Sequence, residues 1–149
     1  MASLVDQISQ DLVVAQKARD EMTVSTLRLL LSAVYNAKIA KGSELTDEET
    51  VKIALKKAKQ HKESIDAYEK GQRADLVAKE KAELAVISKY LPKQLTDSEI
   101  AKIVDEVIAQ SGATSAGDFG KVIGQVMAKV GSQAEGGRVS EIVKGKLAR

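Results

Sequence analysis

The single histidine, His61, is the first residue to consider for chemistry. A side-chain nucleophile needs a base beside it, and an imidazole can serve as that base near neutral pH. His61 lies in a lysine-rich segment, on a predicted helix face that it shares with Val51, Ala54, Ala58 and Ile65. This position favours a histidine packed at the edge of a helix interface, with a catalytic base as the alternative.

Other reactive centres lack their residues or their motifs. The chain has no cysteine, which excludes disulfides, thiolate catalysis, thiolate zinc sites and iron–sulfur clusters. Segment 112–119 comes nearest to a phosphate-binding loop, but Asp118 and Phe119 follow its second glycine where a lysine and a hydroxyl residue are needed. We reject that loop and predict no catalytic residues, no metal site and no cofactor for this chain acting alone.

Lysines gather without acids on one predicted helix, between residues 52 and 62. Three of them, Lys52, Lys56 and Lys59, share one helix face because they are spaced i, i+4 and i+7. Such a face is either solvated and balanced by acids elsewhere, or it contacts phosphates. We treat it as a secondary basic face.

Two glycines inside a later predicted helix mark a second candidate surface. Gly120 and Gly124 continue into Ala128 as a stripe of small residues, with Lys121 and Lys129 beside it. Each glycine costs about 1 kcal/mol relative to alanine within a helix, and close approach by another backbone would compensate. We expect another helix of the same bundle to fill the stripe. The alternative is an RNA backbone held by the two lysines.

Composition predicts the class of fold and the location of the protein in the cell. The chain has 149 residues, of which 44% are hydrophobic, 30% are charged and 3% are aromatic, with one proline. This composition predicts an all-α protein with a core.

The net charge is only +2, although the segment from Ser111 to Arg149 has six basic and three acidic residues. No apolar stretch approaches the roughly 20 residues that span a bilayer, and no secretory signal is visible. We therefore expect a soluble, cytoplasmic protein without membrane contact.

Helix-start and helix-stop residues predict seven helices. Capping boxes begin at Thr46 and Thr96, and glycines end several of the helices. Pro92 interrupts the pattern, so we predict an N-terminal domain of about four helices over residues 1–91 and a three-helix tail over 92–149. The predicted helices cover about residues 4–20, 23–42 with Ser25 as the alternative start, 46–70, 73–90, 96–111 and 115–130. A last helix carries Val139, Ile142, Val143 and Leu147.

Motifs along the whole chain resemble those of the GatB/YqeY family. They are Leu27-Arg28-x-Leu30-x-Ser32-Ala33-x-x-Asn36-x-x-Ile39, Lys59-Gln60-His61-Lys62-Glu63-Ser64, Glu83-Leu84-Ala85-Val86-Ile87-x-x-Tyr90-Leu91-Pro92-Lys93-Gln94-Leu95, Phe119-Gly120-Lys121-Val122-Ile123-Gly124 and Val139-Ser140-Glu141-Ile142-Val143. The resemblance implies a stand-alone YqeY-like protein, similar to the helical and tail domains of the tRNA-dependent amidotransferase B subunit.

That relative implies a function in tRNA metabolism. It belongs to an enzyme that amidates glutamate or aspartate mischarged on tRNA, a carbon–nitrogen ligase with glutamine as the amido-nitrogen donor, and its helical and tail domains engage the tRNA. For the present chain the resemblance implies a non-catalytic module that binds tRNA or a tRNA-processing protein. The alternatives are a protein–protein adaptor without RNA contact and a free-standing amidotransferase.

The resemblance also assigns site residues. It places Gly120, Lys121, Gly124 and Lys129 on the tail helix that faces tRNA, together with the loop 131–137. Arg138 and Lys144 add to the basic charge of this tail. The sequence departs from the family at two places: relatives usually carry a Lys-Gly-Lys or Lys-Gly-Arg run at 131–133, and they commonly carry Arg at the position of His61. We therefore expect a structural or contact role for His61.

Overall fold

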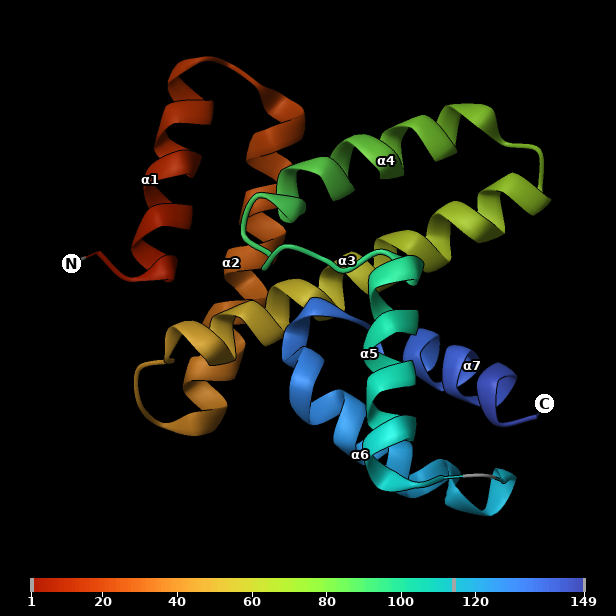
Figure 1. Ribbon diagram of the computed structural model, residues 1–149. Coiled ribbons are helices and arrows are strands. Elements are labelled where there is room, and N and C mark those ends of the chain that lie inside the picture. Colours follow the sequence, from red (N-terminus) through yellow and green to blue (C-terminus); the bar gives the residue numbers. More distant parts are fainter. Residues whose placement is uncertain (1, 114, 149) are drawn as a thin grey trace. The chain divides into compact units, whose positions relative to one another are not determined.

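The computed structural model describes residues 2–113 and 115–148, and their regular structure is entirely helical (Figure 1). This confirms the all-α prediction. Thr114 of the rejected phosphate loop and Arg149 of the basic tail lie outside the described residues. The helices are α1 (Leu4–Lys17), α2 (Glu21–Lys41), α3 (Asp47–Lys70), α4 (Ala74–Ser88), α5 (Asp97–Ser111), α6 (Phe119–Val130) and α7 (Gly136–Leu147).

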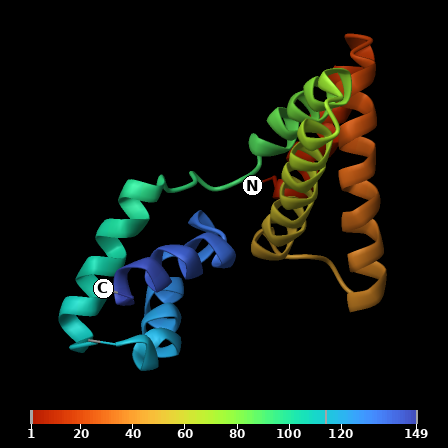
Figure 2. The ribbon, with the colours of Figure 1, turned by 90° about the vertical axis from the view of Figure 1, so that its right-hand side faces the viewer.

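The chain divides into two compact units, residues 1–91 and 92–149. In the first unit, α3 and α4 run antiparallel and α2 packs against both of them, while α1 packs against α2 and α3 (Figures 1 and 2). Its core consists of buried side chains from all four helices and from the residues that follow α4: Ile8, Leu27, Leu30, Ala54, Ala58, Ile87 and Tyr90. The two small alanines of α3 let neighbouring helices approach closely.

The helix ends follow side-chain capping. The predicted boxes at Thr46 and Thr96 are both formed, and each threonine accepts a hydrogen bond from the backbone of the glutamate three residues later. The structure begins α2 at Glu21, earlier than the prediction. The reason is Asp20, whose carboxylate accepts hydrogen bonds from the hydroxyl and the backbone N–H of Thr23 and thereby caps the helix. These bonds also lower the pKa of Asp20.

The connection between α2 and α3 is held by one carboxylate. Glu49 Oε2 accepts hydrogen bonds of 2.7 Å from Lys41 Nζ and 2.7 Å from the backbone N–H of Thr46. The lysine and then the backbone N–H hold the pKa of Glu49 below its ordinary value. Gly42 ends α2 with φ at +79°, a conformation that favours glycine. The predicted stop at this glycine is confirmed.

The second unit packs α5, α6 and α7 around a valine-rich core. A 3₁₀ turn over Ala116–Asp118 precedes α6, which therefore begins at Phe119 instead of residue 115. The predicted loop 131–137 is also shorter, because a 3₁₀ turn fills Gly131–Gln133 and α7 begins at Gly136. The fully buried large side chains of this core are Ile100, Val104, Val107, Val122, Val126, Val130, Val139 and Val143.

The segment that enters α5 is tied to the turn between α6 and α7. The backbone N–H of Leu95 donates to the carbonyl of Gln133 at 2.8 Å, and Nε2 of Gln94 donates to the carbonyl of Ser132 at 3.0 Å. These bonds connect residues 38 positions apart within the second unit. Among the described residues, no helix has the length and apolar content needed to cross a membrane.

Candidate functional site

The glycine stripe of α6 lies on the surface. Gly120, Gly124 and Ala128 are all exposed, opposite the face that buries Val122 and Val126. A Cβ atom added at either glycine meets no heavy atom within 4 Å. The prediction that a helix of the same bundle fills this stripe is therefore wrong. The core needs only the valine face of α6, and the stripe remains open to a partner.

Two exposed lysines lie beside this stripe. Lys121 and Lys129 lie two helical turns apart on α6, about 12 Å along its axis. Neither ammonium forms an ion pair with a described residue. We name the exposed surface formed by Gly120, Lys121, Gly124, Gln125, Ala128 and Lys129 the α6 face. Four of the predicted RNA-contacting residues are thus brought together on one helix.

The two remaining predicted residues of the tail, Arg138 and Lys144, lie on α7. They differ in whether they form an ion pair with a described residue. Arg138 Nε lies 2.5 Å from Asp97 Oδ1, so this guanidinium is engaged at the start of α5. Lys144 is exposed and forms no ion pair within the described chain. Its neighbour on α7, Lys146, lies 3.0 Å from Asp105. Lys144 is therefore the α7 cation that is available to an anion without breaking an ion pair.

The secondary basic face of α3 is also exposed. Lys52, Lys56 and Lys59 form no ion pair with any residue that the structure describes. They belong to the first unit, whereas the α6 face belongs to the second. Among the described residues, lysines without an ion pair thus lie along α3 in the first unit and along α6 in the second.

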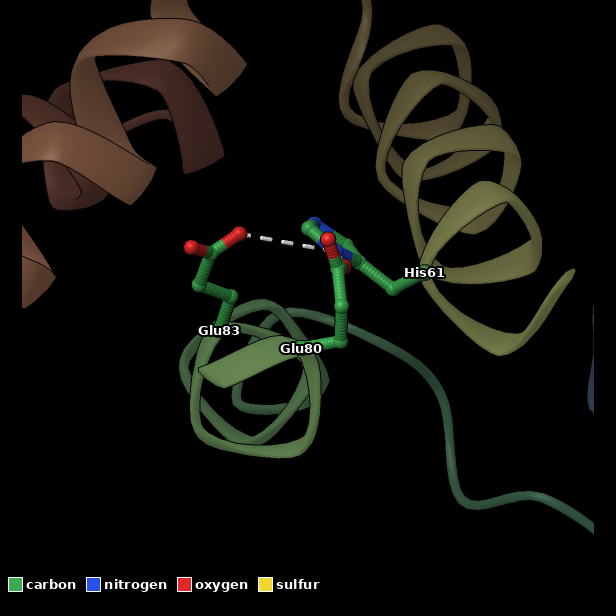
Figure 3. A group of neighbouring side chains, drawn as sticks. All are labelled: His61, Glu80 and Glu83. Atoms are coloured by element: carbon green, nitrogen blue, oxygen red, sulfur yellow. Dashed lines mark hydrogen bonds and ion pairs between the residues drawn. The ribbon is translucent and has the colours of Figure 1, made fainter. Parts of the chain in front are cut away.

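His61 lies between α3 and α4, facing two carboxylates (Figure 3). Its Nδ1 is 2.6 Å from Glu80 Oε2 and 3.7 Å from Glu83 Oε2. All three side chains are largely buried, with 16% to 17% of each exposed. We name these three residues the α3–α4 triad. The prediction of a histidine at the edge of a helix interface agrees with this geometry, whereas the two glutamates were not predicted as its partners.

Glu80 and Glu83 carried a signal that sequence analysis could have used. They are spaced i, i+3 on α4, which places both carboxylates on one helix face. Their pairing with His61 depends on the antiparallel packing of α3 and α4, and residue spacing alone does not specify which turn of α4 lies opposite His61. A search for contiguous motifs therefore missed the triad.

An exposed apolar surface covers parts of α1 and α2. Leu29, Tyr35 and Ile39 on α2 are each 60% to 63% exposed. Tyr35 also lines a groove of about 660 Å³, together with residues of both helices including Leu12 and Arg28. Large exposed apolar patches mark interaction sites in many proteins. Within the described chain the exposed large hydrophobic side chains are confined to these two helices: Val13, Val14, Met22, Leu29, Tyr35 and Ile39.

The fold and the site define a small all-helical protein with an exposed cationic helix face. Comparison of sequences identifies its family, because residues 5–147 match the model of the Yqey-like protein family. The chain belongs to this family, which confirms the resemblance to YqeY-like proteins.

Curated relatives of the chain come from yeasts and carry the name "Altered inheritance of mitochondria protein 41, mitochondrial". The protein of Saccharomyces cerevisiae (strain ATCC 204508 / S288c) is 33% identical over 115 residues, which cover 72% of this chain and 62% of that protein. The protein of Lachancea thermotolerans is 34% identical over 96 residues, covering 64% and 51%. The match thus spans less than two thirds of these relatives. The cytoplasmic location of the present chain stays a prediction.

Proposed function

We propose that this YqeY-family protein is a non-catalytic accessory module that binds tRNA through the α6 face. The observation that carries the proposal is an open glycine stripe with Lys121 and Lys129 beside it, two lysines that form no ion pair with a described residue. A helix surface without side chains at Gly120 and Gly124 lets a sugar–phosphate backbone approach closely. The resemblance of this tail to that of the amidotransferase B subunit supports the choice of tRNA.

The expected mode of binding is electrostatic and follows RNA shape. The α6 face offers ammonium groups and a smooth backbone surface, and its residues include no aromatic side chain on which a base could stack. Cations that neutralise phosphates release counterions, so the affinity must fall as the salt concentration rises. Lys144, which is exposed on α7, supplies further positive charge in the same unit.

Binding of labelled tRNA to the full chain, measured by fluorescence anisotropy over a series of salt concentrations, tests the proposal. We expect the double variant Lys121→Ala/Lys129→Ala to bind more weakly, and each removed phosphate contact to reduce the salt slope by about 1. Lys102→Ala removes another exposed lysine of the same unit and serves as the matched control. Absence of binding at low salt, or equal binding by the double variant and the control, would reject tRNA binding by the α6 face.

The exposed apolar surface of α1 and α2 favours a second candidate function, a protein–protein adaptor. Leu29 and Ile39 are more than half exposed on α2, and a protein partner such as a tRNA-processing protein would cover them. Capture of a partner that survives nuclease treatment and is lost in Leu29→Ser/Ile39→Ser supports this function. Loss of the captured protein after nuclease treatment alone assigns the contact to RNA.

A further inference from the structure

We propose that the α3–α4 triad binds one divalent metal ion of the zinc class. His61, Glu80 and Glu83 each offer one ligand atom, and these atoms all lie within 4.8 Å of one another. An imidazole nitrogen and carboxylate oxygens are ligands that zinc and similar first-row ions accept. This site lies in the first unit, whereas the α6 face belongs to the second.

The packing of two helices positions the ligands. The α3 and α4 helices run side by side, so that His61 of α3 faces the surface of α4 that carries both glutamates (Figure 3). Because Glu80 and Glu83 are one helical turn apart, their carboxylates converge on the same imidazole. Rigid helices hold such ligands more precisely than loops do, which limits the movement needed to bind an ion.

The triad adjoins a cavity that has room for the rest of a coordination sphere. The cavity has a volume of about 270 Å³, and the polar side chains of Gln60 and Ser64 also line it. A zinc ion with three protein ligands takes water as its fourth ligand, and this space accommodates that water. The partial burial of the three side chains strengthens the attraction between the carboxylates and a cation, since the surroundings are less polar than bulk water.

The side chains of the triad carry more negative than positive charge. Two carboxylates face one imidazole, which supplies at most a single positive charge. Nearby cations include Lys79, whose Nζ is 4.0 Å from Oε1 of Glu83, and Lys57, which lines the cavity. A divalent ion placed between the carboxylates would neutralise both of them at short range. The lysines oppose the ion, so we expect modest affinity.

Metal binding requires a small rearrangement. His61 Nδ1 and Glu80 Oε2 are 2.6 Å apart, a distance set by a shared proton. Two ligands of one tetrahedral zinc ion are about 3.4 Å apart when each metal–ligand bond is about 2.1 Å. The ion must therefore displace the proton, and the Glu80 carboxylate must draw back by less than about 1 Å.

Calorimetric titration of the full chain with Zn²⁺, without a polyhistidine tag, tests the proposal. At pH 7.5 we expect one ion per chain. Glu80→Gln and Glu83→Gln keep the size of the side chain but remove its negative charge, and we expect each to bind Zn²⁺ at least about tenfold more weakly. Glu63→Gln, an exposed glutamate of α3, is the matched control and should bind as the unmodified chain does.

Co²⁺ provides a second measurement, because its visible absorption reports ligand geometry. We expect an intense tetrahedral band with the unmodified chain and with Glu63→Gln, and its loss in His61→Ala. Circular dichroism establishes that each variant retains its helices, and the two glutamine variants decide the outcome if His61→Ala does not fold. Absence of stoichiometric binding, or equal affinity of the glutamine variants and the control, would overturn the proposal.

Discussion

The hydroxyl of Tyr90 donates a hydrogen bond of 2.5 Å to Asp11 Oδ2, joining residues 79 positions apart. The Tyr90 ring is buried, and it lies just after α4, two residues before Pro92. Burial, followed by the carboxylate of Asp11, raises the pKa of Tyr90 above its ordinary value. The contact therefore fastens the end of the first unit to α1 with a neutral phenol and a charged acceptor.

Removing this hydroxyl should destabilise the first unit. We expect Tyr90→Phe to lower the free energy of unfolding by about 1.5–3 kcal/mol, the range for hydrogen bonds to charged groups. Urea unfolding followed by circular dichroism measures the change. Tyr35→Phe is the control, because Tyr35 is exposed and forms no hydrogen bond with a described residue. Equal effects of the two substitutions would show that the hydrogen bond contributes nothing.

Replacing Gly124 with alanine should raise the stability of the second unit and weaken tRNA binding. The position is helical and open, so Gly124→Ala should stabilise the second unit by about 0.5–1 kcal/mol. The added methyl group lies on the α6 face, and we expect it to weaken tRNA binding. Gly131→Ala is the opposite case, because Gly131 has φ at +53° and alanine there should destabilise the unit. Urea unfolding and anisotropy measure the two effects; a Gly124→Ala variant less stable than the unmodified chain contradicts the open geometry.

The capping box at Thr96 should contribute measurably to the second unit. Thr96 Oγ1 accepts the backbone N–H of Glu99, and Glu99 Oε2 accepts the backbone N–H of Thr96 at 2.9 Å. We expect Thr96→Ala to lower the free energy of unfolding by about 1 kcal/mol, measured by thermal or urea unfolding. Ser98→Ala, at an exposed position two residues later, should change it by no more than about 0.5 kcal/mol.

The carboxylate of Glu49 should make the stability of the first unit depend on pH. Because Lys41 and Thr46 lower its pKa in the folded state, its contribution is fully present above the unfolded pKa and is lost as the pH falls through the lower, folded value. We expect Glu49→Gln to be less stable than the unmodified chain at pH 7, and the difference to shrink below about pH 4.3. Urea unfolding at pH 7 and pH 3 measures both differences; a gap as large at pH 3 as at pH 7 would show that charge is not its cause.

Local chemistry accounts for what could be predicted from the sequence. The boxes at Thr46 and Thr96 and the stops at Gly42 and Gly112 involve residues within one or two helical turns, so their types and spacing suffice. The start of α2 was missed because Asp20 caps the helix by accepting hydrogen bonds from Thr23, at the position where a capping box has a glutamate or glutamine.

Properties that depend on packing were harder to predict. The number of helices covering α6 decides whether its glycines are buried, and the second unit has only two others, so Gly120 and Gly124 remain exposed. The partners of His61 depend on how α3 is aligned against α4. The exposed apolar surface of α2 was not distinguished from its core face, because Leu27 and Leu30 are buried while Leu29 between them is not.

The length of chain between Asp11 and Tyr90 has a consequence for synthesis of the protein. Translation proceeds at about 5–20 residues per second, so α1 emerges from the ribosome roughly 4–16 seconds before the tyrosine that fastens it. During that interval the apolar side chains of α1, including Ile8, have no complete core to enter. We therefore expect the nascent chain to be a client of ribosome-associated chaperones until α4 has emerged.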